Sequence, residues 1–167
     1  MVLLTICILA LSSCSDDVKI PDGMQLASDD SVSYNLFVPG GWILTESNGI
    51  YGAYYSSSDR SSMTMSSIHP DEGMASVEEY WNTCKTSYDR TYKNFEASEE
   101  QTETLMGEKT AYKYVFSAEI DGESYKFMQL ITVHGGKFYT FVYTSTAENY
   151  EAHLADVEKT LSEIIFK

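Results

Sequence analysis

Hydrophobic and aromatic residues alternate most densely with polar residues between positions 110 and 145. Two dipeptides, Asp121-Gly122 and Gly135-Gly136, interrupt this segment. Both supply the positive φ angles that two-residue type I′ turns require, and β-branched and aromatic residues flank each of them. The pattern therefore predicts three antiparallel strands joined by two tight hairpins.

The predicted turns also determine which residues share a face, because side chains alternate along a strand and a turn sets the register. We expect Phe116 opposite Phe127, and Ile131 opposite Thr140. One face then carries Tyr112, Tyr114, Phe116, Tyr125, Phe127, Ile131, Val133, Phe138 and Val142, and the other carries Val115, Met128, Leu130, Tyr139, Phe141 and Tyr143. A sheet that is apolar on both faces needs cover on both faces. The expected fold class is α+β, with helices on both sides of an antiparallel sheet in an α/β/α sandwich.

Shorter alternating segments precede this region. Residues 33–38 and 42–44 read as two strands separated by Pro39-Gly40-Gly41. Residues 50–56 and 63–68 read as a hairpin around a serine-rich turn. Residues 95–105 are polar, and their alternating Glu side chains are typical of an edge strand that resists further pairing.

Two helices are expected. Ser76 and Glu79 form a capping box at the start of the first, followed by an apolar stripe of Val77, Tyr80, Trp81, Cys84 and Tyr88. Ser145 and Glu148 predict the start of a second helix, with a stripe of Tyr150, Leu154, Val157, Leu161 and Ile164. Both stripes should face the sheet.

The N-terminal residues predict an export signal. Residues 2–11 form an apolar run that is too short to span a bilayer but long enough for the core of a secretory signal. The following Leu11-Ser12-Ser13-Cys14 resembles the lipobox of bacterial lipoproteins, which implies that Cys14 becomes the first mature residue and carries lipid. Because no Lys or Arg precedes the apolar run, we expect the true start to lie upstream.

The expected organisation is a signal peptide at 1–13, the lipidated Cys14 with a flexible tether at 14–32, and a single globular domain at 33–167. This places the protein on the extracytoplasmic side of a bacterial cell membrane, attached through acyl chains on Cys14. With Cys7 removed and Cys14 acylated, Cys84 has no cysteine to pair with in the mature chain.

The net charge of the chain bears on which class of partner it can bind. It carries 25 Asp and Glu against 11 Lys and Arg, for a net charge of −14. Such a field repels the phosphates of nucleic acids, so a nucleic-acid partner is not expected.

The order of these elements resembles the PsbP-like superfamily. The resemblance rests on a first strand ending in Phe37-Val38-Pro39-Gly40-Gly41-Trp42, a middle helix, an antiparallel meander, and a last helix ending in residues 161–167. It implies an antiparallel sheet between helices that serves as a binding or accessory module rather than as an enzyme. It assigns no binding residue, because members of the superfamily bind unrelated partners.

No residue pattern predicts catalysis, a metal or a cofactor. His69, His134 and His153 lack metal-ligand spacing and are interpreted as solvated side chains. Cys84 lies on the apolar stripe and is interpreted as a buried small hydrophobe. Asp71-Glu72 and the Glu residues of 96–103 are a candidate for weak Ca²⁺ binding through clustered carboxylates. They lack the spacing of an EF-hand, however, and are interpreted as a solvated acidic surface. No enzyme motif such as GxSxG, SxxK or a P-loop is present.

The 13 tyrosines exceed what one core needs, although burial on both faces of the sheet could absorb most of them. Tyr51, Tyr54 and Tyr55 cannot all point to the same side of one strand, so some are candidate ligand or partner contacts on the surface. Three hypotheses follow. The first is an accessory lipoprotein that binds an unidentified envelope protein. The second is an envelope hydrolase or transferase with a site between sheet and helix. The third is a carbohydrate-binding module that presents Trp42 with the three tyrosines.

Overall fold

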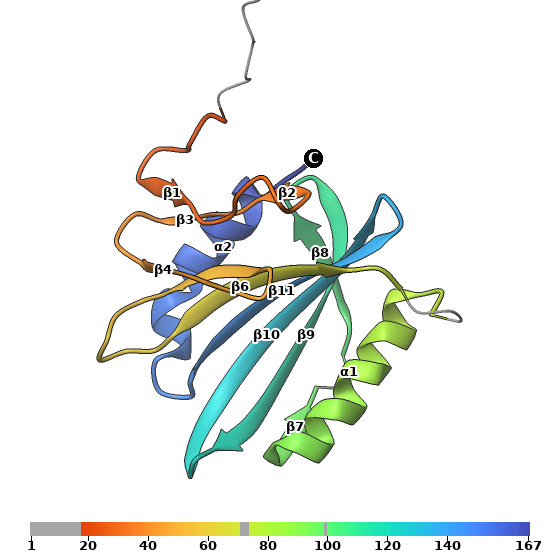
Figure 1. Cartoon of the computed structure of the whole chain (residues 1–167). Coiled ribbons are helices and arrows are strands. Elements are labelled where there is room, and N and C mark those ends of the chain that lie inside the picture. The colour runs from red at the N-terminus through yellow and green to blue at the C-terminus, as the bar shows by residue number, and fades with distance from the viewer. Residues whose placement is uncertain (1–17, 71–73, 99) are drawn as a thin grey trace, which may run out of the picture.

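The computed structural model describes residues 18–70, 74–98 and 100–167. An eight-stranded antiparallel sheet forms the body of the molecule, with strand order β4-β5-β6-β11-β10-β9-β7 and with β8 also pairing with β9 (Figure 1). Two small two-stranded sheets, β1-β3 and β12-β2, accompany it. The elements in chain order are β1 (Met24–Leu26), β2 (Tyr34–Asn35), β3 (Phe37–Pro39), β4 (Ile43–Ser47), β5 (Ile50–Tyr54), β6 (Ser62–Ile68), α1 (Val77–Thr91), β7 (Lys93–Ala97), β8 (Thr102–Met106), β9 (Lys109–Ile120), β10 (Glu123–His134), β11 (Lys137–Thr146), the 3-10 helix η1 (Tyr150–His153), α2 (Leu154–Glu163) and β12 (Ile165–Phe166).

The central meander of β9, β10 and β11 has the predicted register. Phe116 pairs with Phe127, and Ile131 pairs with Thr140. The turn residues adopt the required left-handed backbone, with φ of 53° at Asp121 and 86° at Gly122. Local turn chemistry therefore predicts the long-range pairing of the longest strands correctly.

The two faces of the sheet contribute to two separate cores. Trp81 of α1 packs with Phe116 and Phe127 from one face. Val157 and Leu161 of α2 pack with Leu130 and other residues of the opposite face. The predicted division of the meander residues between two faces is confirmed, and the molecule is an α+β protein built mainly on an antiparallel sheet.

Helix α1 begins where the sequence predicts. The Ser76 hydroxyl accepts a hydrogen bond from the backbone N–H of Glu79. In return, the Glu79 carboxylate accepts one from the backbone N–H of Ser76. The predicted stripe packs on the sheet, with Trp81 stacked on Tyr114 at a ring distance of 4.3 Å and Tyr88 stacked on Phe116 at 5.0 Å. Aromatic rings thus contribute much of the contact between α1 and the sheet.

The predicted start of the second helix is wrong. Strand β11 continues to Thr146, so Ser145 is a buried strand residue, and its hydroxyl lies 2.7 Å from that of Ser61. A 3-10 turn follows, and α2 itself begins at Leu154. Pairing with β10 and contact with Ser61 outweigh the local capping signal at Ser145 and Glu148.

The predicted tether is wrong for part of 14–32. Met24–Leu26 form strand β1, which pairs with β3, and the Met24 side chain is buried. The Gln25 amide donates hydrogen bonds to the backbone oxygens of Pro39 and Trp42. Periodicity missed this strand because it is only three residues long.

The predicted edge strand at 95–105 is two strands. Both β7 and β8 pair with β9, each along a different part of it. The register of β7 shifts between Lys93 and Glu96, as in a β-bulge. Charged side chains and this irregularity both discourage a further strand from pairing here.

Helical cover of the whole sheet, as the sandwich prediction requires, is not shown. Helix α1 packs against β7 and β10, which lie in the half of the sheet away from the edge strand β4 (Figure 1). Its partners in the core come from β7, β9, β10 and β11. The part of the same face that belongs to β4, β5 and β6 has no described helix over it.

Gly107 offers a test of how tightly α2 is joined to the β8–β9 hairpin. Its φ is +56°, and a Cβ there would lie 2.1 Å from the backbone oxygen of Ile164. We expect Gly107→Ala to lower the free energy of unfolding, measured by urea denaturation, by about 1–2 kcal/mol for the left-handed backbone and by about 1–3 kcal/mol more for the clash.

Gly49→Ala is the matched control, because Gly49 also has a positive φ, +77°, but no heavy atom within 4 Å of the added Cβ. Gly49→Ala should lower the free energy of unfolding only by the amount that comes from the left-handed backbone. Equal losses in the two variants would show that the close approach to Ile164 does not constrain the fold.

Candidate functional site

The uncovered part of the sheet, which we call the open face, follows from the register. Phe138 and Val142 belong to the core under α1, and they pair with Ile68 and Thr64 of β6. Because side chains alternate along each strand, the same side of the sheet carries the following residues of β4, β5 and β6: Ile43, Thr45, Ser47, Ile50, Gly52, Tyr54, Ser62, Thr64, Ser66 and Ile68. The intervening residues, such as Met63 and Met65, point into the other core.

The open face carries three exposed isoleucines among hydroxyl side chains, and no Asp or Glu. Ile43 is 44% exposed, Ile50 is 45% exposed and Ile68 is 41% exposed. The remaining side chains are hydroxyl groups and Tyr54, whose ring lies 4.4 Å under the Arg60 guanidinium. In a chain of net charge −14, a patch without carboxylates stands out. Exposed apolar surface of this kind is typical of contact sites for other molecules.

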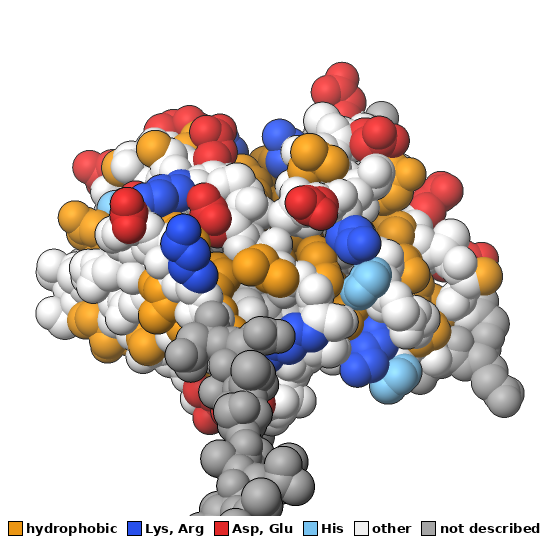
Figure 2. All heavy atoms as spheres, turned by 90° about the horizontal axis from the view of Figure 1, so that it is seen from above, with side chains coloured by type: hydrophobic (Ala, Val, Ile, Leu, Met, Phe, Trp, Pro, Cys, Tyr) orange, Lys and Arg blue, Asp and Glu red, His pale blue; other side chains and the backbone are white. Residues whose placement is uncertain are grey.

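A different surface of the molecule mixes charged and apolar side chains. The view from above shows Asp and Glu side chains distributed over the surface, with hydrophobic side chains exposed between them (Figure 2). The surface in this view carries many carboxylates, whereas the open face carries none.

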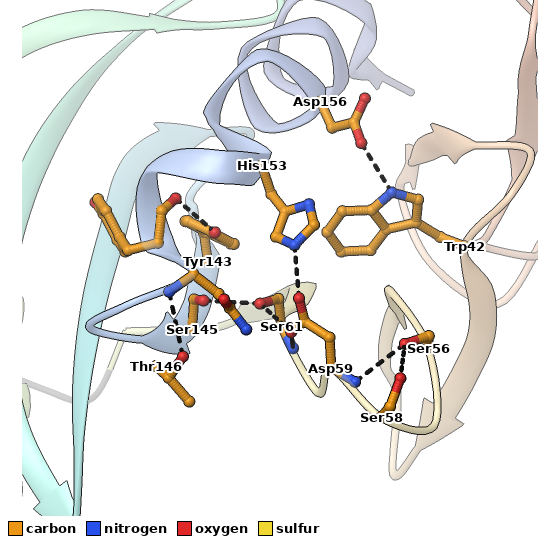
Figure 3. Close-up of polar contacts among 12 residues, drawn as sticks. Trp42, Ser56, Ser58, Asp59, Ser61, Tyr143, Ser145, Thr146, His153 and Asp156 are labelled. Atoms are coloured by element: carbon orange, nitrogen blue, oxygen red, sulfur yellow. Dashed lines mark hydrogen bonds and ion pairs between the residues drawn. The ribbon is translucent and has the colours of Figure 1, made fainter.

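A polar cluster supports the loop between β5 and β6, beside the open face (Figure 3). Asp59 is its centre: one carboxylate oxygen lies 2.8 Å from Nε2 of His153, and the other accepts hydrogen bonds from the Ser61 hydroxyl at 2.6 Å and the Ser61 backbone N–H at 2.9 Å. Next to it, the Trp42 indole N–H donates to Asp156 at 3.0 Å. Asp59 thereby ties the loop to η1, and Trp42 ties the start of β4 to α2.

The cluster does not have the geometry of a catalytic triad. The Ser61 hydroxyl contacts Asp59 and Ser145, and no described hydrogen bond joins it to His153. A nucleophilic serine needs a base in direct contact to remove its proton. Burial acts to raise the pKa of Asp59, but the hydrogen bonds from Ser61 and His153 outweigh it and lower the pKa below its ordinary value. Asp59 is thus held as a carboxylate, in a structural role.

The interpretation of His153 as a solvated histidine is wrong. His153 is 7% exposed, and its ring packs on Trp42 and Tyr55 at 5.5 Å and 4.2 Å. The sequence offers no signal for its contact with Asp59, which lies 94 positions away. His69 is exposed and His134 is half-buried.

The structure separates the predicted contact tyrosines from one another. Tyr51 is buried, with its hydroxyl 2.9 Å from that of Ser31, and Trp42 is also buried. Tyr54 is half-buried on the open face, and Tyr55 is 43% exposed beside His153. The four rings therefore do not form a shared exposed platform for a sugar, and the prediction of that platform is wrong.

Cys84 is half-buried under α1 among Tyr80, Tyr88 and Gln129. Burial raises the pKa of its thiol, and hydrogen bonding with Gln129 and Tyr80 only partly opposes this. A thiol with a raised pKa is a poor nucleophile, which agrees with the interpretation of Cys84 as a packing residue.

Two further predictions concern metals and the membrane. Within residues 18–70, 74–98 and 100–167, no group of three or more His, Cys, Asp or Glu could hold a metal ion. Asp71-Glu72 and Glu99 lie outside the described residues, and so does the lipidation site Cys14. No helix in the described part of the chain is long and apolar enough to cross a membrane.

Comparison with known proteins places the fold. No protein-family model matches the sequence, and no curated protein matches it. Among solved structures, cyanobacterial PsbP (CyanoP) of Synechocystis sp. PCC 6803 is 16% identical, with a TM-score of 0.63 over 94% of this chain and 99% of that one. LpqN of Mycobacterium tuberculosis, a protein involved in cell envelope biogenesis, is 13% identical, with a TM-score of 0.58 over 80% of this chain and 83% of that one.

The Ran-binding protein Mog1p of Saccharomyces cerevisiae is 6% identical, with a TM-score of 0.59 over 86% of this chain and 95% of that one. Identities this low show the fold alone. The chain has a PsbP-like fold, as its resemblance to that superfamily implies.

The Asp59 cluster predicts a specific pH dependence of stability. Because the folded-state pKa of Asp59 is lowered, this group stabilises the fold above its unfolded pKa near 3.8, and that contribution is lost as the pH falls through the lower folded value. We expect Asp59→Asn to reduce the free energy of unfolding by about 1–3 kcal/mol at neutral pH, with a smaller difference from the wild type in acid.

Urea denaturation at several pH values measures this effect. Asp89→Asn is the control, because Asp89 is exposed on α1. If Asp59→Asn were as stable as Asp89→Asn at every pH, the cluster would contribute nothing to holding the loop.

Proposed function

We propose that this protein is a non-catalytic binding or accessory module that acts through contacts with another protein. The observation that carries this proposal is the open face, which combines three exposed isoleucines with an absence of carboxylates. Exposed apolar side chains on a surface without carboxylates suit contact with another protein. A partner on the open face would supply the cover that the α/β/α prediction assigns to the chain's own helices.

Features of the described residues favour binding over catalysis. The best candidate for a nucleophile and base, Ser61 with His153, lacks the necessary contact, and Cys84 has a raised thiol pKa. The fold also occurs in the Ran-binding protein Mog1p, which binds a protein partner. The fold leaves function open, since one fold hosts many functions, so the open face carries the greater weight.

We further propose that the protein is held at the extracytoplasmic side of a bacterial membrane by lipid on Cys14. The lipobox-like sequence at 11–14 supports this, directly after an apolar run of signal length. Two or three acyl chains would anchor the domain despite its charge of −14, because each buried methylene contributes about 0.8 kcal/mol. LpqN, with a similar fold, is involved in cell envelope biogenesis.

The anchor is tested by Cys14→Ala in cells fractionated into membrane and soluble material. We expect the variant to leave the membrane fraction and to lose the mass of the acyl chains, because the thiol that carries them is gone. Cys84→Ala is the control and should stay in the membrane fraction. A Cys14→Ala protein that remained membrane-bound and processed like the wild type would contradict the lipobox reading.

The binding surface is tested with a photo-reactive phenylalanine analogue at Ile50 or Ile68 in native membranes. We expect both positions to form the same protein adduct. Ile165 is the control, because it is 50% exposed but lies on β12, away from the open face. Adducts that formed equally from Ile165, or from neither open-face position, would argue against this surface.

A further inference from the structure

Strand β4 ends the sheet with an unusually accessible edge. All five of its residues are exposed, including Leu44 at 45%. Its turn to β5 has two residues, Asn48 and Gly49, with φ of 52° and 77°. In such a hairpin the closing pair, Ser47 and Ile50, exchanges both backbone hydrogen bonds.

The backbone groups of β4 then alternate in direction. Those of Ile43, Thr45 and Ser47 point toward β5, and those of Leu44 and Glu46 point away from the sheet. No backbone hydrogen bond among residues 18–70, 74–98 and 100–167 uses the peptide groups of Leu44 or Glu46 on that outer side. Two donors and two acceptors are available there for another strand.

The opposite edge of the sheet is protected and β4 is not. At the far edge, β7 has a register shift and β8 shares the same partner strand, with Lys93, Glu96 and Glu103 among their exposed side chains. Natural sheets use such charges and bulges to prevent pairing between molecules. Strand β4 has a regular register along its whole length and a single charge, Glu46.

The sequence of β4 is compatible with antiparallel pairing between the β4 strands of two copies in one register. If Leu44 pairs with Glu46 of a second copy, the two strands form four backbone hydrogen bonds about a two-fold axis at Thr45. Thr45 then faces Thr45 of the other copy, which is a favourable cross-strand pair. Ile43 faces Ser47 on the open-face side, so no two like charges stand opposite each other.

Charge also favours this edge as the contact between two copies. Each chain carries −14, so two copies associate most easily where carboxylates are few. The open face beside β4 has none, and the Glu46 carboxylate accepts a hydrogen bond from the Gly49 backbone N–H at 3.2 Å, within its own turn. Pairing would bury part of Ile43 and Leu44 from both copies.

We propose that the protein forms a symmetric dimer in which β4 pairs with β4 of a second copy, with Thr45 on the two-fold axis. The dimer joins two sheets into one and makes the two open faces continuous across the axis. This inference rests on the edge of the sheet and is independent of the lipid anchor and of the partner on the open face.

Disulfide cross-linking of the full chain tests the register. Opposed residues at a non-hydrogen-bonded antiparallel position have Cα atoms about 4.5 Å apart, within the range that a disulfide spans. We therefore expect Thr45→Cys to form a covalent dimer under mild oxidation. Ser47→Cys faces Ile43 of the other copy and should not, and the wild type controls for the native cysteines.

A second pair of variants tests whether the backbone edge carries the contact. Glu46→Pro removes an outward N–H without removing a hydrogen bond to β5, so it should convert the dimer to a monomer in sedimentation equilibrium of the full chain in density-matched detergent. Glu46→Thr removes the same carboxylate but keeps the N–H, and should remain dimeric. Thermal melting followed by circular dichroism shows whether both variants are folded.

Each outcome of these experiments either supports or overturns the proposed dimer. A dimeric wild type with selective cross-linking at Thr45→Cys, lost in combination with Glu46→Pro, supports the proposal. A wild type that sediments as a monomer at all concentrations overturns it. Equal cross-linking at Thr45→Cys and Ser47→Cys, or a β4 edge occupied by a different protein, overturns it as well. None of these results depends on whether Ile50 or Cys14 behaves as proposed above.

Discussion

The structure depends above all on the backbone pairing of β9, β10 and β11. These are the longest strands, and two tight turns with left-handed residues at Asp121-Gly122 and Gly135-Gly136 set their register. A shift by one residue would move every aromatic side chain to the opposite face. Both cores, one with α1 and one with α2, require this single register to be correct.

Both faces of the sheet carry apolar side chains that need cover, and the two helices cover them only in part. Helix α1 covers one face over β9, β10 and β11 with stacked aromatic rings, and stops short of β4, β5 and β6. The remaining surface has no carboxylates, carries exposed isoleucines and ends in an unprotected strand edge. The surface on which we propose that another molecule binds is therefore the part of the sheet that the helices leave uncovered.

Polar contacts over long sequence distances hold the region beside this surface. Asp59 joins the loop between β5 and β6 to His153, and Asp156 accepts the hydrogen bond of a buried Trp42. Burying these groups is tolerable because each has a partner. The first contact holds the β5–β6 loop against η1, and the second joins the residue before β4 to α2. The lowered pKa of Asp59 predicts that the first contact weakens in acid.

By itself, the sequence determined the features that local chemistry controls: the hairpin register, the division of aromatic residues between two faces, and the capping box of α1. Each of these depends on residues within a few positions of one another or on strict alternation. Only the tertiary structure decided that Ser145 stays in a strand, that Met24–Leu26 join the fold, and that His153 is buried against Asp59. These outcomes depend on contacts between distant segments, whose energies outweigh the weak local preferences that a pattern can detect.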